Sequence, residues 1–457
     1  MAIRYFGGMG DAIRFSSSCG EGHGATDAIG RFLSGVMMTL TCFVATPSSG
    51  RLPYFDTIVR AVLAAYIAVL PFKSMLVVAR NGFLVLLGLL IVWCVINRRF
   101  FYSRTPYDML LLAFAAWVGF TIPFAVVPSY SLKEYGKLLE YMVVFYAVIY
   151  FFKEPRARQI LWGLIGLVAV AVTAYGLSQF NLQNPQAVVS FFSSEVWLTT
   201  FLVMVIPFAL VLALGEGPPE IRSGGAIAAG MMIVCLISTQ SRAGLVALVW
   251  ELWVLAYFIR SASAKVVASL VTVYVIVAVM LLFNEGAMPV AGVSDGIANS
   301  LPVKRGFSSA FHRLEIWGFV LLEIPKHWLV GIGYGSLSYI FLYGQDQEVV
   351  MPGHYAITHA GTHNIVLYLA LHVGVPGLLL FGWFIIQFTL KTAWAYRCVH
   401  EWIPKAVLLG AVGSVTGLML RLQFDQMLVG TLATFFWVLL ALAVLSYPLC
   451  DQVTEEI

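Results

Sequence analysis

The sequence contains 457 residues, of which 60% are hydrophobic and only 11% are charged. Soluble domains carry roughly a quarter charged residues, so this composition, with a mean hydropathy of +0.88, excludes a soluble globular protein. The net charge of +4 does not indicate nucleic-acid binding. The six cysteines form no CxxC pair, so no disulfide framework is predicted.

Hydrophobic runs long enough to cross roughly 30 Å of hydrocarbon recur along the chain. Residues 1–54 are expected to form a partly disordered N-terminal extension, because the first thirty are rich in Gly and Ser. Within it, the short apolar stretch Phe32–Ala45 is a thirteenth span, an interfacial helix or simply part of the extension. The fold class predicted is an all-α integral membrane protein with about twelve transmembrane helices. The predicted spans are 55–72, 81–97, 107–127, 136–152, 158–179, 194–214, 225–240, 243–259, 265–283, 363–390, 404–421 and 428–448.

Lys and Arg are distributed unevenly between alternate loops, and this asymmetry predicts the orientation. The richer set of loops contains Arg98, Arg99, Arg104, Lys153, Arg156, Arg158, Arg222, Arg260, Lys265, Lys391, Arg397 and Lys405. These loops are therefore predicted to be cytoplasmic, with both termini inside and residues 451–457 as a cytoplasmic tail. Nine spans within 55–283 and three within 363–450 then enclose an external loop, 284–362. A break after the ninth span differs from the two similar halves of many permeases.

The external loop contains a predicted amphipathic helix, Ser308–Ile324. Ser308 or Ser309 is expected to cap it, and Pro325 to end it. Phe311, Leu314, Trp317 and Leu321 recur at helical spacing and form its predicted apolar face. The following sequence, Gly331-Ile-Gly-Tyr-Gly335, is predicted to be a flexible turn whose backbone amides approach a ligand. It lacks the Lys-Ser/Thr pair of a P-loop, so no nucleotide site is predicted.

Three of the eight histidines, His354, His359 and His363, lie within ten residues where the external loop meets the tenth span. Polar clusters at a membrane are costly and are commonly functional. His363-Asn364 opens the tenth span, and a helix N-terminus disfavours the imidazolium ion. Neutral imidazole suits a general base. The alternative is that the pair is a polar cap at the membrane interface, with His359 as an unassigned neighbour one turn earlier.

Two arginines are predicted to lie on the same outer side as these histidines. Arg242 is in the tight turn Ser238–Gly244, and Arg313 shares a helix face with Trp317. Guanidinium groups match phosphate oxygens bidentately, so His363 and these arginines predict an anion-binding catalytic pocket. Arg80, on the first external loop, could add positive charge. The alternative is that each arginine reaches lipid phosphate on its own.

A metal site is the competing interpretation of the histidines, because a spacing of four residues on a helix suits zinc. The chain has no HExxH motif and no DxD-like motif on the predicted outer side. We therefore expect neither a metal nor another cofactor.

Three motifs resemble the O-antigen ligase and polymerase superfamily of bacterial envelope enzymes. The family signature is His followed by Asn, Ser or Gln, then nine residues, Gly, two or three residues, and Gly, Thr or Tyr. His363-Asn364, followed by Gly374 and Gly377, is similar to it. The turn Ser241–Gly244 resembles the sequence around the family's first important arginine. Arg313-x-x-x-Trp317, with the later Pro325 and Gly331-Ile-Gly333, resembles the second. The resemblance covers about 55–450, with its specificity concentrated in 238–380.

This resemblance implies a GT-C-like, inverting, metal-independent glycosyltransferase in the bacterial inner membrane, with 284–362 in the periplasm. Its donor would be a glycan on undecaprenyl pyrophosphate and its acceptor a sugar hydroxyl of lipid A–core, as in O-antigen ligases. His363 would be the base, supported by His359, Asn364 and Trp317, and no nucleotide would be needed. Arg242, Arg313 and Arg80 would bind the donor pyrophosphate. An O-antigen polymerase or a protein O-oligosaccharyltransferase is the alternative, and a lipid-linked glycan permease is a more distant one.

Overall fold

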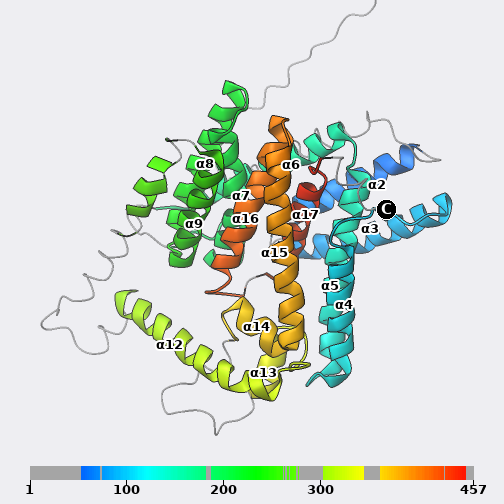
Figure 1. The fold of residues 1–457 in the computed structure, drawn as a ribbon, viewed down its shortest axis with the longest axis vertical. Coiled ribbons are helices and arrows are strands. Elements are labelled where there is room, and N and C mark those ends of the chain that lie inside the picture. Colours follow the sequence, from blue (N-terminus) through cyan, green and yellow to red (C-terminus); the bar gives the residue numbers. More distant parts are fainter. Residues whose placement is uncertain are drawn as a thin grey trace, which may run out of the picture.

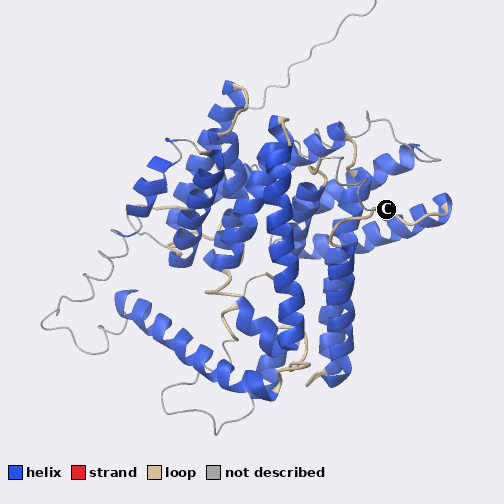
Figure 2. Cartoon of the chain, viewed as in Figure 1, coloured by secondary structure: helices blue, strands red, loops and turns tan. Residues whose placement is uncertain are grey.

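The computed structural model describes residues 53–72, 75–181, 187–260, some residues within 262–276, and then 302–343, 361–426 and 428–448. All the regular secondary structure in these residues is helical, as expected for an all-α protein (Figure 2). His354, His359, the apolar stretch 32–45 and most of the predicted span 265–283 lie outside them.

The described helices follow the predicted spans closely, and prolines begin α5, α6 and α8, where a missing N–H costs nothing. The helices are α2 (Pro53–Val69), α3 (Leu76–Asn97), α4 (Asp108–Thr121), α5 (Pro128–Phe151), α6 (Pro155–Ser178), α7 (Glu195–Leu214), α8 (Pro219–Ser238), α9 (Arg242–Ile259), α12 (Pro302–Glu323), α13 (Leu337–Tyr343), α14 (Ile365–His372), α15 (Gly374–Cys398), α16 (Trp402–Arg421) and α17 (Gly430–Val444). Short 3-10 turns, η2 (Ile122–Phe124) and η4 (Ile324–Lys326), follow α4 and α12.

Seven of the described helices are long and apolar enough to cross a membrane, namely α3, α6, α7, α8, α9, α15 and α16. α17 and the α4–η2 segment are shorter apolar helices. The outer helix α3 exposes Val77, Leu84 and Val95, as expected for a helix that contacts lipid. The chain is thus an integral membrane protein, and its total of twelve spans stays a prediction.

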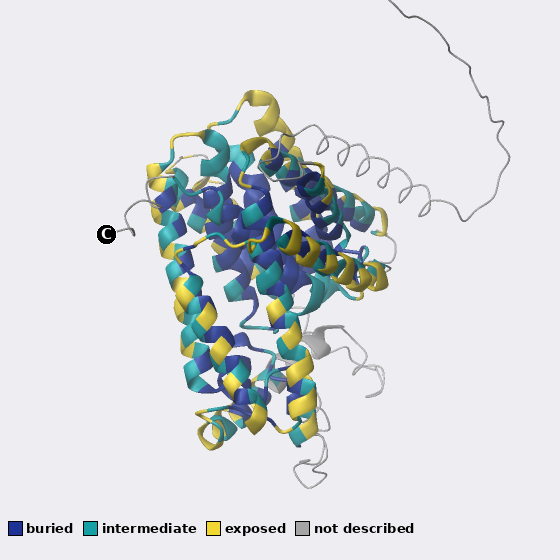
Figure 3. Ribbon diagram, turned by 90° about the vertical axis from the view of Figure 1, so that its right-hand side faces the viewer, coloured by how far each residue is buried: buried dark blue, intermediate teal, exposed yellow. Residues whose placement is uncertain are grey.

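The core of the bundle is built around α7, which is buried continuously from Leu198 to Val211. Helices with apolar residues on every side are found inside large or membrane-embedded bundles. α7 packs against α8, α9 and α16, and Figure 3 shows the buried residues gathered in the middle of the bundle. α7 is therefore a central helix of the bundle.

The predicted span 363–390 is wrong as a single helix, because it is divided into α14 and α15. Gly374, at the division, has a φ of +74. A β carbon at Gly374 would lie 2.0 Å from the carbonyl oxygen of Leu329, so only glycine fits there. The eight residues of α14 consequently form a separate short helix beside α15 (Figure 1).

The predicted helix of the external loop is confirmed as α12, which ends before Pro325 and runs obliquely across one end of the bundle (Figure 1). Its predicted start is wrong: α12 begins at Pro302, so Ser308 and Ser309 lie inside it. The predicted apolar face is also shifted. Ile316 and Val320 are fully buried, whereas Leu314 and Leu321 are more than half exposed. The buried pair packs with residues of α13 and α14, which anchors α12 to the rest of the protein.

The glycine-rich sequence that follows η4 is a packing element, and the prediction of a flexible ligand-approaching turn is wrong. Gly331, Gly333 and Gly335 all have positive φ, and a β carbon on any of them would overlap a neighbouring segment. The amides of Ile332 and Gly333 donate to the carbonyl oxygens of Leu371 and His372, at 2.9 and 3.0 Å. These bonds satisfy the C-terminal carbonyls of α14, so the two amides are already used.

Candidate active site

The segment that begins α14 is fixed against the loop between α16 and α17. The Ile365 amide donates to the Leu422 carbonyl at 2.9 Å, and the buried Thr362 hydroxyl donates to Gln426 Oε1 at 2.9 Å. Gly361 has a φ of +76, and a β carbon there would lie 2.7 Å from Gln426 Nε2. Two regions that are distant in sequence are therefore held in one fixed arrangement.

Asn364 is the N-cap of α14. Its Oδ1 accepts hydrogen bonds from the amides of Val366 and Leu367, at 2.9 and 3.1 Å. Its Nδ2 donates to the carbonyl oxygen and to Oε1 of Gln423, at 3.0 and 3.3 Å. Side-chain caps of this kind satisfy amides that a helix start leaves unpaired. The amide group of Asn364 is fully occupied, so its contacts support α14 and the neighbouring His363.

His363 precedes this cap in a left-handed conformation, with a φ of +46. Non-glycine residues rarely adopt it, and such strain is held in place mainly at functional sites. The Nδ1 atom lies 3.3 Å from Asp425 Oδ1, and the two side chains are 27% and 9% exposed. Because an ionised carboxylate only accepts hydrogen bonds, it pairs with the form of His363 that carries a proton on Nδ1. Nε2 then keeps the lone pair that a base requires.

Asp425 is the site residue that sequence reasoning missed. It follows His363 by 62 residues, and no motif connects the two. The one available signal was its position, since it is an acidic residue beside a span on the predicted outer side. A base whose orientation is fixed by a carboxylate is a recurring catalytic arrangement.

Arg313, on α12, lies close to the same group of residues. It is half-buried, and its charge acts on the guanidinium of Arg421, as does the charge of Asp425. Arg421 ends α16, one turn before Asp425. Trp317, one turn after Arg313, is half-buried beside the cluster that anchors α12, and its Nε1 has no hydrogen-bond partner in the described part of the chain. The structure thus gives Trp317 a packing contact.

Arg242 reaches the same end of the bundle as the first residue of α9, where its side chain is exposed. The Ser241 hydroxyl caps this helix by accepting from the Gly244 amide at 3.3 Å. Thr199 of α7 holds the turn, because its hydroxyl lies 3.0 Å from that of Thr239. Three residues earlier on α7, the carbonyl oxygen of Val196 accepts from Arg421. The start of α7 therefore links the turn of Arg242 to the end of α16.

The structure does not place every predicted residue in this cluster. Arg80 is exposed in the first turn of α3, whose main packing partner is α2. Within the described ranges, no hydrogen bond or ion pair joins Arg80 to the cluster, and its role stays a prediction. His359 lies outside the described residues. In the part of the chain that is described, no group of three His, Cys, Asp or Glu side chains could hold a metal ion.

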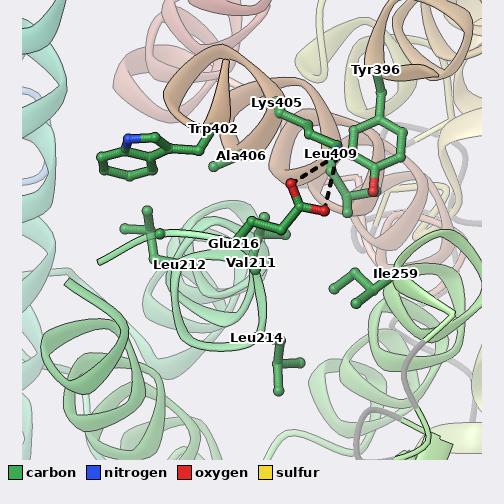
Figure 4. Close-up of a pocket in the computed structure, with 12 residues that line it drawn as sticks. Val211, Leu212, Leu214, Glu216, Ile259, Tyr396, Trp402, Lys405, Ala406 and Leu409 are labelled. Carbon is green, nitrogen blue, oxygen red and sulfur yellow. Dashed lines mark hydrogen bonds and ion pairs between the residues drawn. The ribbon is translucent and has the colours of Figure 1, made fainter. Parts of the chain in front are cut away.

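A cavity of about 170 Å³ lies at the opposite ends of the same helices. Its lining comes from the last turns of α7 and α9 and the first turns of α16, and includes Trp402 and Tyr396 (Figure 4). Lys405 there forms an ion pair with Glu216 at 3.1 Å. The cavity is therefore separate from His363, which lies beside the end of α16.

The model of the O-antigen ligase family matches residues 227–382. This match supports membership of the O-antigen ligase superfamily. The matched residues include Arg242, Arg313 and His363, whereas Arg80 and Asp425 lie outside them. A search of curated proteins finds no match.

The spacing of the superfamily motif has a structural explanation in this chain. Asn364 caps α14, the nine residues that follow it contain that whole helix, and Gly374 permits the close approach to Leu329. The Val375 amide then donates to the Trp328 carbonyl at 2.7 Å. The motif therefore specifies a short capped helix with His363 at its start.

Proposed function

We propose that the protein is an O-antigen ligase that transfers O-antigen polysaccharide from undecaprenyl pyrophosphate to a sugar hydroxyl of lipid A–core. It acts as an inverting, metal-independent glycosyltransferase. The observation that carries this proposal is the pair of His363 and Asp425, 3.3 Å apart, at the end of the bundle where Arg242 and Arg313 also lie. The match to the O-antigen ligase family supports the lipid-linked substrate class.

In the proposed reaction, the acceptor hydroxyl attacks the anomeric carbon of the donor sugar. A bond forms between these two atoms while the bond from that carbon to the pyrophosphate oxygen breaks. The electron pair leaves with undecaprenyl pyrophosphate, and the hydroxyl proton moves to Nε2 of His363. Asp425 stabilises the imidazolium that results. A single displacement inverts the anomeric configuration.

The arginines stabilise the leaving group. Charge develops on the pyrophosphate oxygens as the bond breaks, and fixed guanidinium groups bind such oxygens strongly in a site from which water is excluded. Arg242 and Arg313 supply this charge in the proposal, and Arg80 adds to it. Because the donor already carries a good leaving group, neither a nucleotide nor a metal is required.

We place this site on the periplasmic side of the bacterial inner membrane. The turn of Arg242, the start of α14 and the loop of Asp425 are in contact through the start of α7 and the end of α16. The distribution of Lys and Arg predicts that all three lie outside the cytoplasm. A site at this end of a helical bundle lets lipid tails enter sideways from the bilayer.

The test is a transfer reaction with purified protein, a lipid-linked glycan and lipid A–core, with the His363→Ala variant as control. Glycan covalently attached to lipid A–core, with inverted anomeric configuration, is the expected product. Extension of one lipid-linked glycan by another would instead identify a polymerase, and transfer to a protein would identify an O-oligosaccharyltransferase. Movement of the donor across vesicles without covalent transfer would identify a permease.

A further inference from the structure

Glu251, near the middle of α9, is fully buried in a helix long and apolar enough to cross the membrane. Neither of its carboxyl oxygens has a hydrogen-bond partner among the described residues. Glu140, on α5, is different, because its Oε1 accepts a hydrogen bond of 2.8 Å from the Tyr66 hydroxyl. A carboxylate buried without donors loses its hydration and gains nothing in return, and ionisable residues inside membrane spans commonly have a function. Packing alone therefore does not explain Glu251.

The carboxyl group of Glu251 lies against α16 at a position where α16 has no side chain. A β carbon on Gly417 would lie 2.2 Å from Oε1 and 2.7 Å from the carboxyl carbon of Glu251, so only glycine leaves room for the group. α16 also packs against α7, and α7 against α9 (Figure 1). The carboxyl group thus occupies a fitted space between packed helices, away from water.

A backbone acceptor that lacks its usual donor lies on α7. Pro207, inside this helix, has no N–H, so the carbonyl oxygen of Val203, one turn earlier, receives no hydrogen bond from the fourth following residue. Carbonyls freed in this way inside a membrane are satisfied by neighbouring helices, by Ser or Thr side chains or by ordered water. Val203 is fully buried, which favours a donor from a neighbouring helix.

A contact on α16 places Glu251 at the level of Val203. A β carbon on Gly413 would lie 2.9 Å from Pro207 and 3.3 Å from Leu255, so α7 and α9 meet there. These two helices run in the same direction, because their starts are linked at one end of the bundle and their last turns line the same cavity. One turn before the contact, α7 reaches Val203 and α9 reaches Glu251. α16 runs the opposite way and, one turn after the contact, reaches the glycine against which Glu251 lies.

We propose that Glu251 is a proton-binding site at the centre of the bundle. The bound proton keeps the carboxyl group neutral, and the hydroxyl that it forms donates a hydrogen bond to the carbonyl oxygen of Val203. This bond joins α9 to α7, and α16 closes over it at Gly417. The three helices whose outer ends support the candidate active site are held together in this way. The site goes beyond the proposed function, because it does not depend on which reaction the protein catalyses.

No counter-charge takes the place of this proton in the described structure. The nearest cation along α16 is Arg421, one turn after Gly417, and it forms no hydrogen bond with Glu251. The other charged groups on the helices packed around Glu251 lie at or near the helix ends. They are Arg242 and Arg260 at the ends of α9, Glu195 on α7, Glu220 and Arg222 on α8, and Lys405 on α16.

Infrared spectroscopy detects the bound proton without turnover, because a neutral carboxylic acid has a C=O stretching band that an ionised carboxylate lacks. At neutral pH we expect Glu251→Gln to remove such a band from the wild-type spectrum. Glu140→Gln, which changes the acid with a tyrosine partner, is the matched control and should keep the band of Glu251. A Glu251→Gln spectrum that lacks no such band would show that Glu251 is ionised in the folded protein and would overturn the proposal.

Unfolding in detergent at different pH values measures the energy of proton binding. Unfolding exposes Glu251 to water, where carboxyl groups are ionised above about pH 5, so the folded protein holds a proton that the unfolded chain releases. The wild type should therefore lose stability between about pH 5 and about pH 8. Its unfolding temperature relative to Glu251→Gln should fall by several degrees, and this subtraction removes the effects of the other charged groups. A constant difference across this range would contradict proton binding.

The hydrogen bond to Val203 is tested by Glu251→Met, which fills a similar space but cannot donate. At low pH this variant should unfold at a lower temperature than Glu251→Gln, because the Val203 carbonyl is left buried without a donor. In a Pro207→Ala background the two variants should differ less, since the carbonyl regains a helical donor. Equal unfolding temperatures of the two variants when Pro207 is present would leave Glu251 with a space-filling role and would overturn the bond.

Discussion

Two histidines lie at opposite ends of α14 and have opposite surroundings. His363 is partly exposed, is strained and has Asp425 at Nδ1. His372 is 1% exposed, its ring stacks on Tyr368 with 4.1 Å between centroids, and its Nδ1 lies 2.8 Å from the Tyr368 carbonyl oxygen. Only His363 combines an accessible ring with a carboxylate that can stabilise its protonated form. A histidine is therefore suited to proton transfer by the exposure of its ring and by its hydrogen-bond partner, more than by its position on a helix.

The largest expected difference in activity is between variants of the two histidines. We predict that His363→Ala lowers kcat by roughly 10²–10⁴-fold, while the variant still inserts and folds. His372→Phe keeps a ring against Tyr368 and should retain most of the activity. The transfer assay measures both, with circular dichroism and gel filtration as controls of folding. Near-normal turnover by His363→Ala would remove it from the mechanism.

The arginines should give the next largest effect. Arg242→Ala and Arg313→Ala are each expected to lower kcat roughly 10²-fold and to weaken donor binding. Lys substitutions should restore little, because an ammonium group cannot make bidentate contacts with phosphate. Arg222→Ala, which removes an exposed arginine from the other end of the bundle, is the matched control. Arg80→Ala decides whether Arg80 takes part in donor binding. An equal loss of kcat in Arg222→Ala would indicate a non-specific effect of charge.

The stability of Asn364 variants tests how much this residue supports α14 and the neighbouring His363. Asn364→Ala removes the cap of α14 and should lower the free energy of unfolding by about 1 kcal/mol. Asn364→Asp keeps an acceptor for the two helix amides but loses the donor to Gln423, so it shows how much the link between the two segments contributes. Unfolding in detergent is the measurement. If Asn364→Ala is fully stable but inactive, Asn364 has a chemical role that its contacts do not explain.

The smallest effect is expected from chelation. Exhaustive treatment with EDTA should leave the transfer rate unchanged, because the arginines supply the positive charge at the pyrophosphate. A loss of activity that returns on addition of a divalent cation would contradict this account and would direct attention to His354 and His359.

Local features were predictable from sequence, whereas features that depend on packing were not. The helix ends at Pro325 and at the Asn364 cap follow from the properties of single residues. The division at Gly374 depends on the approach of Leu329, and the use of the Gly333 amide depends on His372. Asp425 and Arg421 reach the site only through the fold of α16 against α7 and α14. A periodic pattern contains no information about such contacts.

The central claim, that His363 and Asp425 act as one unit, is tested most directly by a double-mutant cycle of kcat. Groups that act together show strongly non-additive losses. We predict that Asp425→Asn lowers kcat in the wild type but has almost no further effect when His363 is already Ala. Losses that multiply in the double variant would show that the two residues act independently and would contradict the account.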